Sequence, residues 1–168
     1  MNAQLLEETE LLRGPAYREW LRGRTVSVVG LARSGVAACR LLHQLGALVL
    51  ASDVKPRSAL ARDALALEAE GVRLSAGGHP AGAFRGAELV VVSPGVPTDL
   101  PVLRELRRAG VPLVGEIELA WRVMEAQVIA NRGCLIGHDN RISAFVTLGP
   151  GANLAGALLT SPSRRLAR

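Results

Sequence analysis

Residues 25–36 read TVSVVGLARSGV, a β-branched run that ends at a glycine and continues into a stretch with helical spacing. Gly30, Ala32 and Gly35 stand at the marked positions of a G-x-G-x-x-G turn, with alanine in place of the middle glycine. Such a turn leaves a buried strand sharply and points the free N–H groups of the next helix at an anion. The stretch therefore predicts a phosphate or diphosphate site, to which Ser34 can add a hydroxyl group. A strand-to-helix turn without a ligand is the alternative.

The alternation of short β-branched runs and longer amphipathic stretches covers residues 24–130. It is typical of α/β proteins and predicts a Rossmann-like, doubly wound parallel sheet with helices on both faces. Residues 1–23 are expected to form a helical extension in front of it. The expected strands cover 25–30, 47–52, 72–76 and 88–93, with shorter candidates at 112–115 and 126–130. The expected helices cover 34–45, 57–70, 100–109 and 116–124, and an apolar stripe of Val36, Leu41, Leu42 and Leu45 marks the first.

Asp53 follows the second expected strand, in the segment ASDVKPR. This position lies at the carboxyl edge of the sheet beside the glycine turn, where an acid can accept hydrogen bonds from a nucleoside. In an NAD enzyme the carboxylate would take a ribose hydroxyl, and in a uridine binder it could accept the N3–H of the base. Capping of the helix expected from Arg57 is the structural alternative.

The fourth expected strand ends in SPGVP, residues 93–97. Proline and glycine at this place predict a rigid crest with exposed backbone N–H groups, at the edge where such sheets bind ligands. A turn with no role beyond chain reversal is the alternative.

The segments VVGLARSG, SDVKPR, VVVSPGVP and GVPLVGEIELA, taken together and in this order, resemble the N-terminal domain of the Mur ligases, most closely the D-glutamate-adding type. In that family the domain holds the UDP moiety of a peptidoglycan precursor, UDP-N-acetylmuramoyl-L-alanine. The resemblance covers residues 24–130 and implies a protein of cell-wall synthesis. It places three groups of residues at the ligand: Gly30, Arg33, Ser34 and Gly35 near the diphosphate; Asp53 and Lys55 near the uridine; Ser93, Pro94 and Gly95 on the sugar-phosphate side.

The chain departs from that family after residue 130. There the family continues into a glycine-rich loop whose lysine reaches the phosphates of ATP and whose hydroxyl group holds magnesium. This sequence reads NRGCLIGHDN instead, and its single lysine is Lys55. We therefore expect no cofactor in this chain, ATP and magnesium belonging only to a full-length ligase, and no ligase activity from it alone. A natural fusion, a truncation before the ATP-binding domain and a chimera all fit the change near Ile129.

Residues 131–159 have a pattern of their own. Ile136, Ile142, Leu148 and Leu154 recur at six-residue spacing, the period of a left-handed parallel β-helix with about 18 residues per coil. The segment resembles hexapeptide acetyltransferases of the sialic-acid and bacillosamine type, which implies His138 as a catalytic base, oriented by Asp139, and acetyl-CoA as the cofactor in this alternative function. A loop histidine is the plainer interpretation of His138. We expect an incomplete repeat that can self-associate, and a basic, disordered tail over 160–168.

The composition of the chain argues against several other classes of function. The formal charge is +5, but aromatic residues make up only 3% of the chain, so few side chains could stack on nucleic-acid bases and we expect no nucleic-acid partner. No apolar run reaches the roughly 20 residues that span a bilayer, so we expect no membrane insertion. Two distant cysteines, Cys39 and Cys134, predict neither a metal site nor a disulfide framework. They fit a reducing cytoplasm, so we expect a cytoplasmic protein. An NAD-binding oxidoreductase fragment remains a further alternative, because the same glycine turn would serve it.

Overall fold

The computed structural model describes residues 12–124 in full, and beyond them only the backbone of short strands. The chain divides into two compact units, Met1–Val123 and Met124–Arg168, which we describe separately. The predicted helical extension is represented by helix α2, Gly14–Leu21, and residues 1–11 lie outside the described part.

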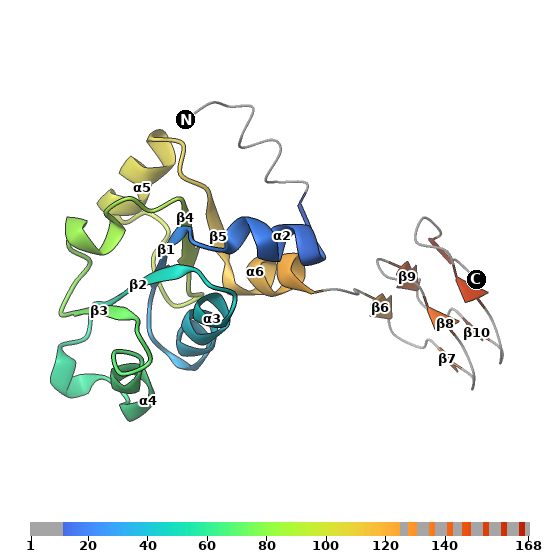
Figure 1. Cartoon of the computed structure of the whole chain (residues 1–168), viewed down its shortest axis with the longest axis horizontal. Helices are drawn as coiled ribbons and strands as arrows, with labels where there is room; N and C mark the ends of the chain where they lie inside the picture. Colours follow the sequence, from blue (N-terminus) through green and yellow to red (C-terminus); the bar gives the residue numbers. More distant parts are fainter. Residues whose placement is uncertain are drawn as a thin grey trace. The chain divides into compact units, whose positions relative to one another are not determined.

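The first unit is built on a five-stranded parallel sheet in the order β3-β2-β1-β4-β5 (Figure 1). The strands are β1 Thr25–Val29, β2 Leu48–Asp53, β3 Arg73–Ala76, β4 Leu89–Val92 and β5 Leu113–Gly115. All four strand pairs are parallel. Four long strands and one short candidate that the sequence predicts are thus present, and the predicted fold class is confirmed.

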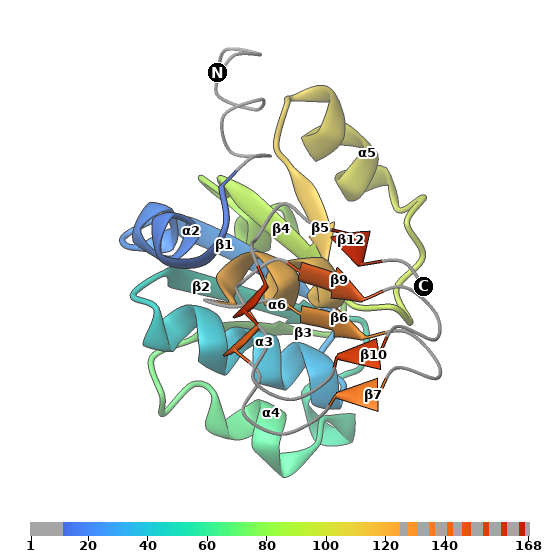
Figure 2. The same cartoon turned by 90° about the vertical axis from the view of Figure 1, so that its right-hand side faces the viewer.

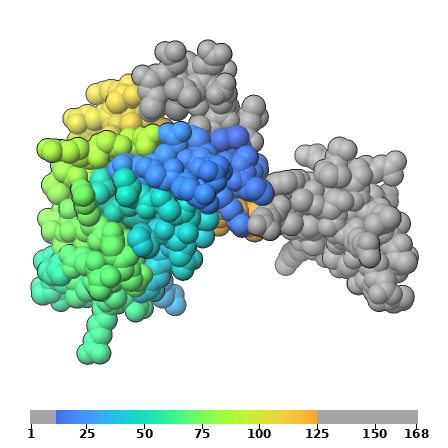
Figure 3. All heavy atoms as spheres, viewed as in Figure 1, coloured from blue at the N-terminus to red at the C-terminus, as the bar shows by residue number. Residues whose placement is uncertain are grey.

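Helices cover both faces of this sheet. One layer holds α2, α3 (Arg33–Gln44), α4 (Arg62–Ala66) and α6 (Glu116–Val123), whose buried side chains pack on Val26 and Val28 of β1. The other holds the 3-10 helix η2 (Ala81–Phe84) and α5 (Pro101–Arg108), which pack on Val29 and Val90. Helices α3 and α6 face the viewer in Figure 2, and the space-filling view shows residues of α2 in blue and of α3 in cyan on one face of the unit (Figure 3).

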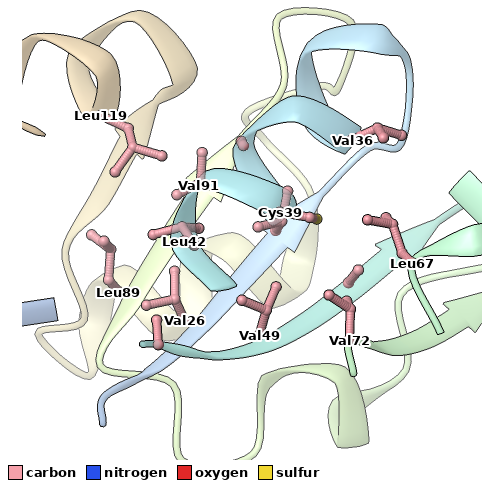
Figure 4. Packing of buried hydrophobic residues seen from close by; sticks show 14 of the residues in the cluster. Val26, Val36, Cys39, Leu42, Val49, Leu67, Val72, Leu89, Val91 and Leu119 are labelled. Carbon is pink, nitrogen blue, oxygen red and sulfur yellow. The ribbon is translucent and has the colours of Figure 1, made fainter. Parts of the chain in front are cut away.

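The apolar stripe predicted on α3 enters the core only in part. Val36 and Leu42 are buried, together with Cys39, whereas Leu41 and Leu45 are only partly buried at its margin. Figure 4 shows Cys39 and Leu42 over the sheet, close to Val26 and Val49. The side chains that α3 buries therefore hold its first turn at a fixed place above the end of β1.

The prediction of one helix over 57–70 was wrong. The chain forms a short 3-10 helix, η1 (Arg57–Ala59), and then α4, separated by Leu60 and Ala61 in extended conformation with ψ of 145° and 151°. The break turns Leu60 into the core, where its exposure falls to 9%. Burial of this leucine outweighs the helical propensity of the surrounding segment.

The last candidate strand of the predicted sheet belongs to the second unit. Strand β6, Val128–Ala130, pairs with β9, Val146–Leu148, and not with the five-stranded sheet. The remaining strands of this unit are β7 Leu135–Ile136, β8 Arg141–Ile142, β10 Asn153–Leu154, β11 Leu159–Thr160 and β12 Arg165–Leu166. Every pair is parallel and joins residues 18 positions apart, as Val128 and Val146 are.

Candidate functional site

The glycine turn and the SPGVP crest meet at one place on the sheet. Gly30 directly follows β1 and Ser93 directly follows β4, and these two strands are neighbours. The chain runs from β1 to β2 and β3 on one side, then crosses to β4 and β5 on the other. Open α/β sheets bind ligands outside the carboxyl ends of the strands at such a switch point. The two predicted turns therefore form one candidate site.

Gly30 is required at the turn by both conformation and space. Its φ is +94°, a region that side-chain-bearing residues rarely adopt. A Cβ there would lie 2.8 Å from Cγ2 of Val96 and 2.9 Å from Cβ of Ser93. The absence of a side chain thus lets the turn after β1 pack directly against the crest after β4.

Gly35, in the first turn of α3, packs even more closely. A Cβ on Gly35 would lie 2.0 Å from the carbonyl oxygen of Gly30 and 3.0 Å from Oγ of Ser93. Ala32, at the middle position of the glycine pattern, is exposed and precedes the helix in extended conformation. The first and last glycines of the pattern, Gly30 and Gly35, therefore serve close packing. The middle position does not, and it accepts Ala32.

The N-terminus of α3 is open toward the site. No side chain caps it within the described part of the chain, and both Arg33 and Ser34 are exposed. The first N–H groups of a helix lack partners inside the helix and carry the positive end of its dipole. A 12-residue helix that begins at Arg33 thus presents N–H groups, a guanidinium and a hydroxyl group at the same corner.

Asp53 braces this corner from β2. Its side chain is buried; Oδ2 accepts the backbone N–H of Leu31 at 2.7 Å, and Oδ1 accepts that of Lys55 at 2.8 Å. Helix η1 has no side-chain cap, so the alternative role of Asp53 as its cap is wrong. The carboxylate instead joins the turn after β1 to the loop after β2.

A hollow of about 760 Å³ lies between α3 and the loop that follows β2. Its wall combines the apolar side chains of Leu31, Val36 and Leu60 with the cations of Arg33 and Lys55. Within residues 12–124 neither of these two cations forms an ion pair, whereas Arg40 in the same wall pairs with Glu70 at 2.8 Å. The hollow thus offers an apolar surface, the cations of Arg33 and Lys55 and the carboxylate of Asp63 beside the glycine turn.

The crest after β4 is a tight turn held from both ends. The N–H of Ser93 donates to the carbonyl oxygen of Val29 at 2.9 Å, and that of Val96 to the carbonyl oxygen of Ser93 at 3.0 Å. Ser93 is buried, whereas Pro94 and Gly95 are exposed. Of the predicted crest residues, Pro94 and Gly95 therefore face solvent and Ser93 faces the protein.

Sequence reasoning missed two side chains at this edge. Glu116 begins α6 and accepts a hydrogen bond from the Ser93 hydroxyl. Nδ1 of His79 lies 2.9 Å from Oγ of Ser52. Partial burial lowers the pKa of His79, and the smaller effect of the negative charge of Asp53 raises it. Neither contact follows from sequence spacing, because each joins residues more than 20 positions apart.

Other predicted sites lie elsewhere or outside the described residues. His138 and Asp139, on which the acyltransferase alternative rests, are outside them. Within the described residues, no three His, Cys, Asp or Glu side chains gather where they could hold a metal ion. Burial raises the pKa of the Cys39 thiol to about 12, so it stays protonated near neutral pH. Among the described helices, none combines the length and apolar character needed to cross a bilayer.

Comparison with known families agrees with this geometry. The model of the Mur ligase MurD-like N-terminal domain matches residues 24–115, which contain the glycine turn, Asp53 and the crest. The chain belongs to this family. The MurD-like domain accounts for the five-stranded sheet, since the matched residues begin just before β1 and end with β5.

Curated relatives of this MurD-like chain carry the name UDP-N-acetylmuramoylalanine-D-glutamate ligase. The protein of Anaeromyxobacter dehalogenans is 50% identical over 104 residues, 62% of this chain and 22% of that protein. That of Acidobacterium capsulatum is 45% identical over 113 residues, 67% of this chain and 24% of that protein. That of Trichlorobacter lovleyi is 40% identical over 151 residues, 85% of this chain and 34% of that protein. The chain thus spans about a quarter to a third of these relatives.

The solved structure of a pseudomurein peptide ligase type C from Methanothermus fervidus also overlaps with the chain. The overlap covers 68% of this chain and 23% of that protein, with 19% identity and a TM-score of 0.47.

Proposed function

We propose that the first unit binds the uridine diphosphate moiety of UDP-N-acetylmuramoyl-L-alanine, as the N-terminal domain of a D-glutamate-adding ligase. The observation that carries the proposal is the junction of the glycine turn, the open N-terminus of α3 and the crest at the switch point of a MurD-like sheet.

The diphosphate belongs at the glycine turn. Helix N–H groups and cations are the partners that phosphate oxygens prefer, and this corner combines the start of α3 with Arg33, Ser34 and Lys55. Because Gly30 and Gly35 carry no side chains, the turn after β1, the start of α3 and the crest pack closely together at this corner. Pro94 and Gly95 are exposed on the crest, which packs against the glycine turn, and we assign them to the sugar-phosphate side.

The uridine belongs beside the loop after β2. The hollow there has apolar wall residues on which a base can lie, with Lys55 at its side. Asp53 already accepts two backbone N–H groups, yet each carboxylate oxygen can accept a second hydrogen bond. We assign Asp53 to the N3–H of uracil on this ground, in addition to its bracing role.

The ligase reaction itself is not assigned to this chain. Residues 131–140 lack the lysine of an ATP-binding loop, and the chain spans a minor part of its relatives. Binding of the precursor is therefore the activity we propose for the MurD-like unit.

Calorimetry on the whole chain tests the proposal with three ligands measured separately: UDP-N-acetylmuramoyl-L-alanine, UDP and NAD. We expect both uridine ligands to bind and NAD to bind more weakly or not at all. Tighter binding of NAD than of either uridine ligand would replace the proposal with the oxidoreductase alternative.

For the second unit we propose a short three-sided parallel coil that self-associates. The 18-residue offset of its strand pairs supports the coil length expected from the hexapeptide period. So few coils bury little of their axis, and a second copy would supply the missing contacts. Analytical ultracentrifugation over a range of concentrations tests this, and a monomer at all concentrations would contradict it.

A further inference from the structure

Glu116 places a carboxylate beside the crest that borders the glycine turn of the proposed nucleotide site. It is the first residue of α6, and Oε1 accepts a hydrogen bond from the hydroxyl group of Ser93. The same hydroxyl oxygen lies 3.0 Å from the carbonyl oxygen of Gly30. One hydroxyl hydrogen cannot serve both acceptors fully, and bonds to ionised acceptors are the stronger ones. The Ser93 hydroxyl is therefore engaged by protein and is not a free donor for a phosphate.

The carboxylate is separated from the glycine turn by this single hydroxyl group. Oγ of Ser93 lies 3.0 Å from the position of a Cβ on Gly35 and 3.1 Å from that of a Cβ on Gly30. Glu116 is also close enough to Cys39 of α3 to add to the rise in its thiol pKa, which burial dominates. A negative charge thus stands on the crest side of the turn, while the cations of Arg33 and Lys55 stand in the hollow beside it.

This arrangement penalises additional negative charge on a bound ligand. A diphosphate linked to a sugar has no terminal phosphate group, whereas free UDP has one whose second ionisation occurs near pH 6. Like charges within several ångströms repel strongly at the surface of a protein. Resting on the function proposed above, we propose that Glu116 is a specificity-determining residue that favours the sugar-linked nucleotide over free UDP.

The test compares the affinities for UDP-N-acetylmuramoyl-L-alanine and for UDP at pH 7.5 and low ionic strength, by calorimetry on the whole chain. In Glu116→Gln the ratio of the two affinities should shift toward free UDP by about three- to tenfold, because the negative charge that repels the terminal phosphate is removed. Glu116→Asp keeps the charge and should keep the wild-type ratio. Glu116→Ala replaces the glutamine variant if the latter unfolds at the assay temperature.

Two controls separate charge from structure. Glu105→Gln makes the same charge change on α5, in the layer that packs on the other face of the sheet, and should leave the ratio unchanged. Ser93→Ala removes the hydroxyl group and keeps the carboxylate, so the ratio should stay near the wild-type value because the charge is retained. If the wild type binds neither ligand, the proposed function fails. If it binds both and the ratio stays the same in the neutral Glu116 variants, the specificity role is overturned.

Discussion

The carboxylate of Asp53 holds the backbone N–H of Leu31 at 2.7 Å, and thereby joins the end of β2 to the turn after β1. The two residues are 22 positions apart, and the second carboxylate oxygen holds the N–H of Lys55 in the same loop region. One buried side chain thus fixes the backbone on two sides of the candidate site.

Asp53→Ala is expected to lower the free energy of unfolding by about 1 to 3 kcal/mol, because it leaves two backbone N–H groups without their acceptor. If Asp53 also contacts uracil, UDP affinity should fall by a similar amount. Urea unfolding and calorimetry measure the two effects. Unchanged UDP affinity in a folded Asp53→Ala protein would leave Asp53 with the bracing role alone.

Gly35→Ala is expected to destabilise the first unit by about 3 kcal/mol or more, because its Cβ would meet the carbonyl oxygen of Gly30 at 2.0 Å and the backbone must move. Gly82→Ala is the matched control, since a Cβ at Gly82 meets no atom within 4 Å. Thermal unfolding of both variants checks the difference. Equal melting temperatures would show that the turn after β1 tolerates a side chain at its third pattern position.

Arg33→Ala and Lys55→Ala are each expected to weaken UDP binding by about 1.5 to 3 kcal/mol, the usual contribution of a hydrogen bond to a charged group. The effect should shrink as salt is raised, and stability should be unchanged because both side chains are exposed. Arg108→Ala, on α5 in the other layer, removes the same charge as a control. An equal loss in all three variants would indicate a general effect of net charge.

His79 should make the first unit less stable in acid. Its pKa in the folded protein is lowered by burial, so the unfolded chain binds the proton more readily. The contribution is complete above the ordinary histidine pKa of about 6.5 and is lost as pH falls through the lower folded value. Stability measured from pH 7.5 to pH 5 should fall more steeply in the wild type than in His79→Asn. Parallel curves would exclude this histidine as the cause.

The sequence was sufficient for those features that depend on neighbouring residues. The β-branched run before Gly30 and the helical spacing after it led to β1, the turn and α3, because strand, turn and helix signals are local. The break at Leu60 was not predictable in this way, since burial in the core decides it. Strand β6 was assigned to the wrong sheet because a short apolar run does not reveal its pairing partner.

The contacts within the site were harder to foresee. Asp53 could equally have capped a helix by its spacing, and only the position of Leu31 shows what its carboxylate holds. The hydrogen bond between Ser93 and Glu116 joins the residues that directly follow β4 and β5. These strands are neighbours in the sheet, and no rule of sequence spacing predicts the contact.

The pairing of β1 with β4 also affects when the site forms during folding. Gly30 and Ser93 are 63 positions apart, and the chain completes β2 and β3 before it returns to pair β4 with β1. Long-range pairings of this kind form slowly, because the intervening chain must be closed into a loop first. A partly folded chain that has only the first three strands therefore lacks the crest, and a ligand of the proposed site can add stability only to the finished sheet.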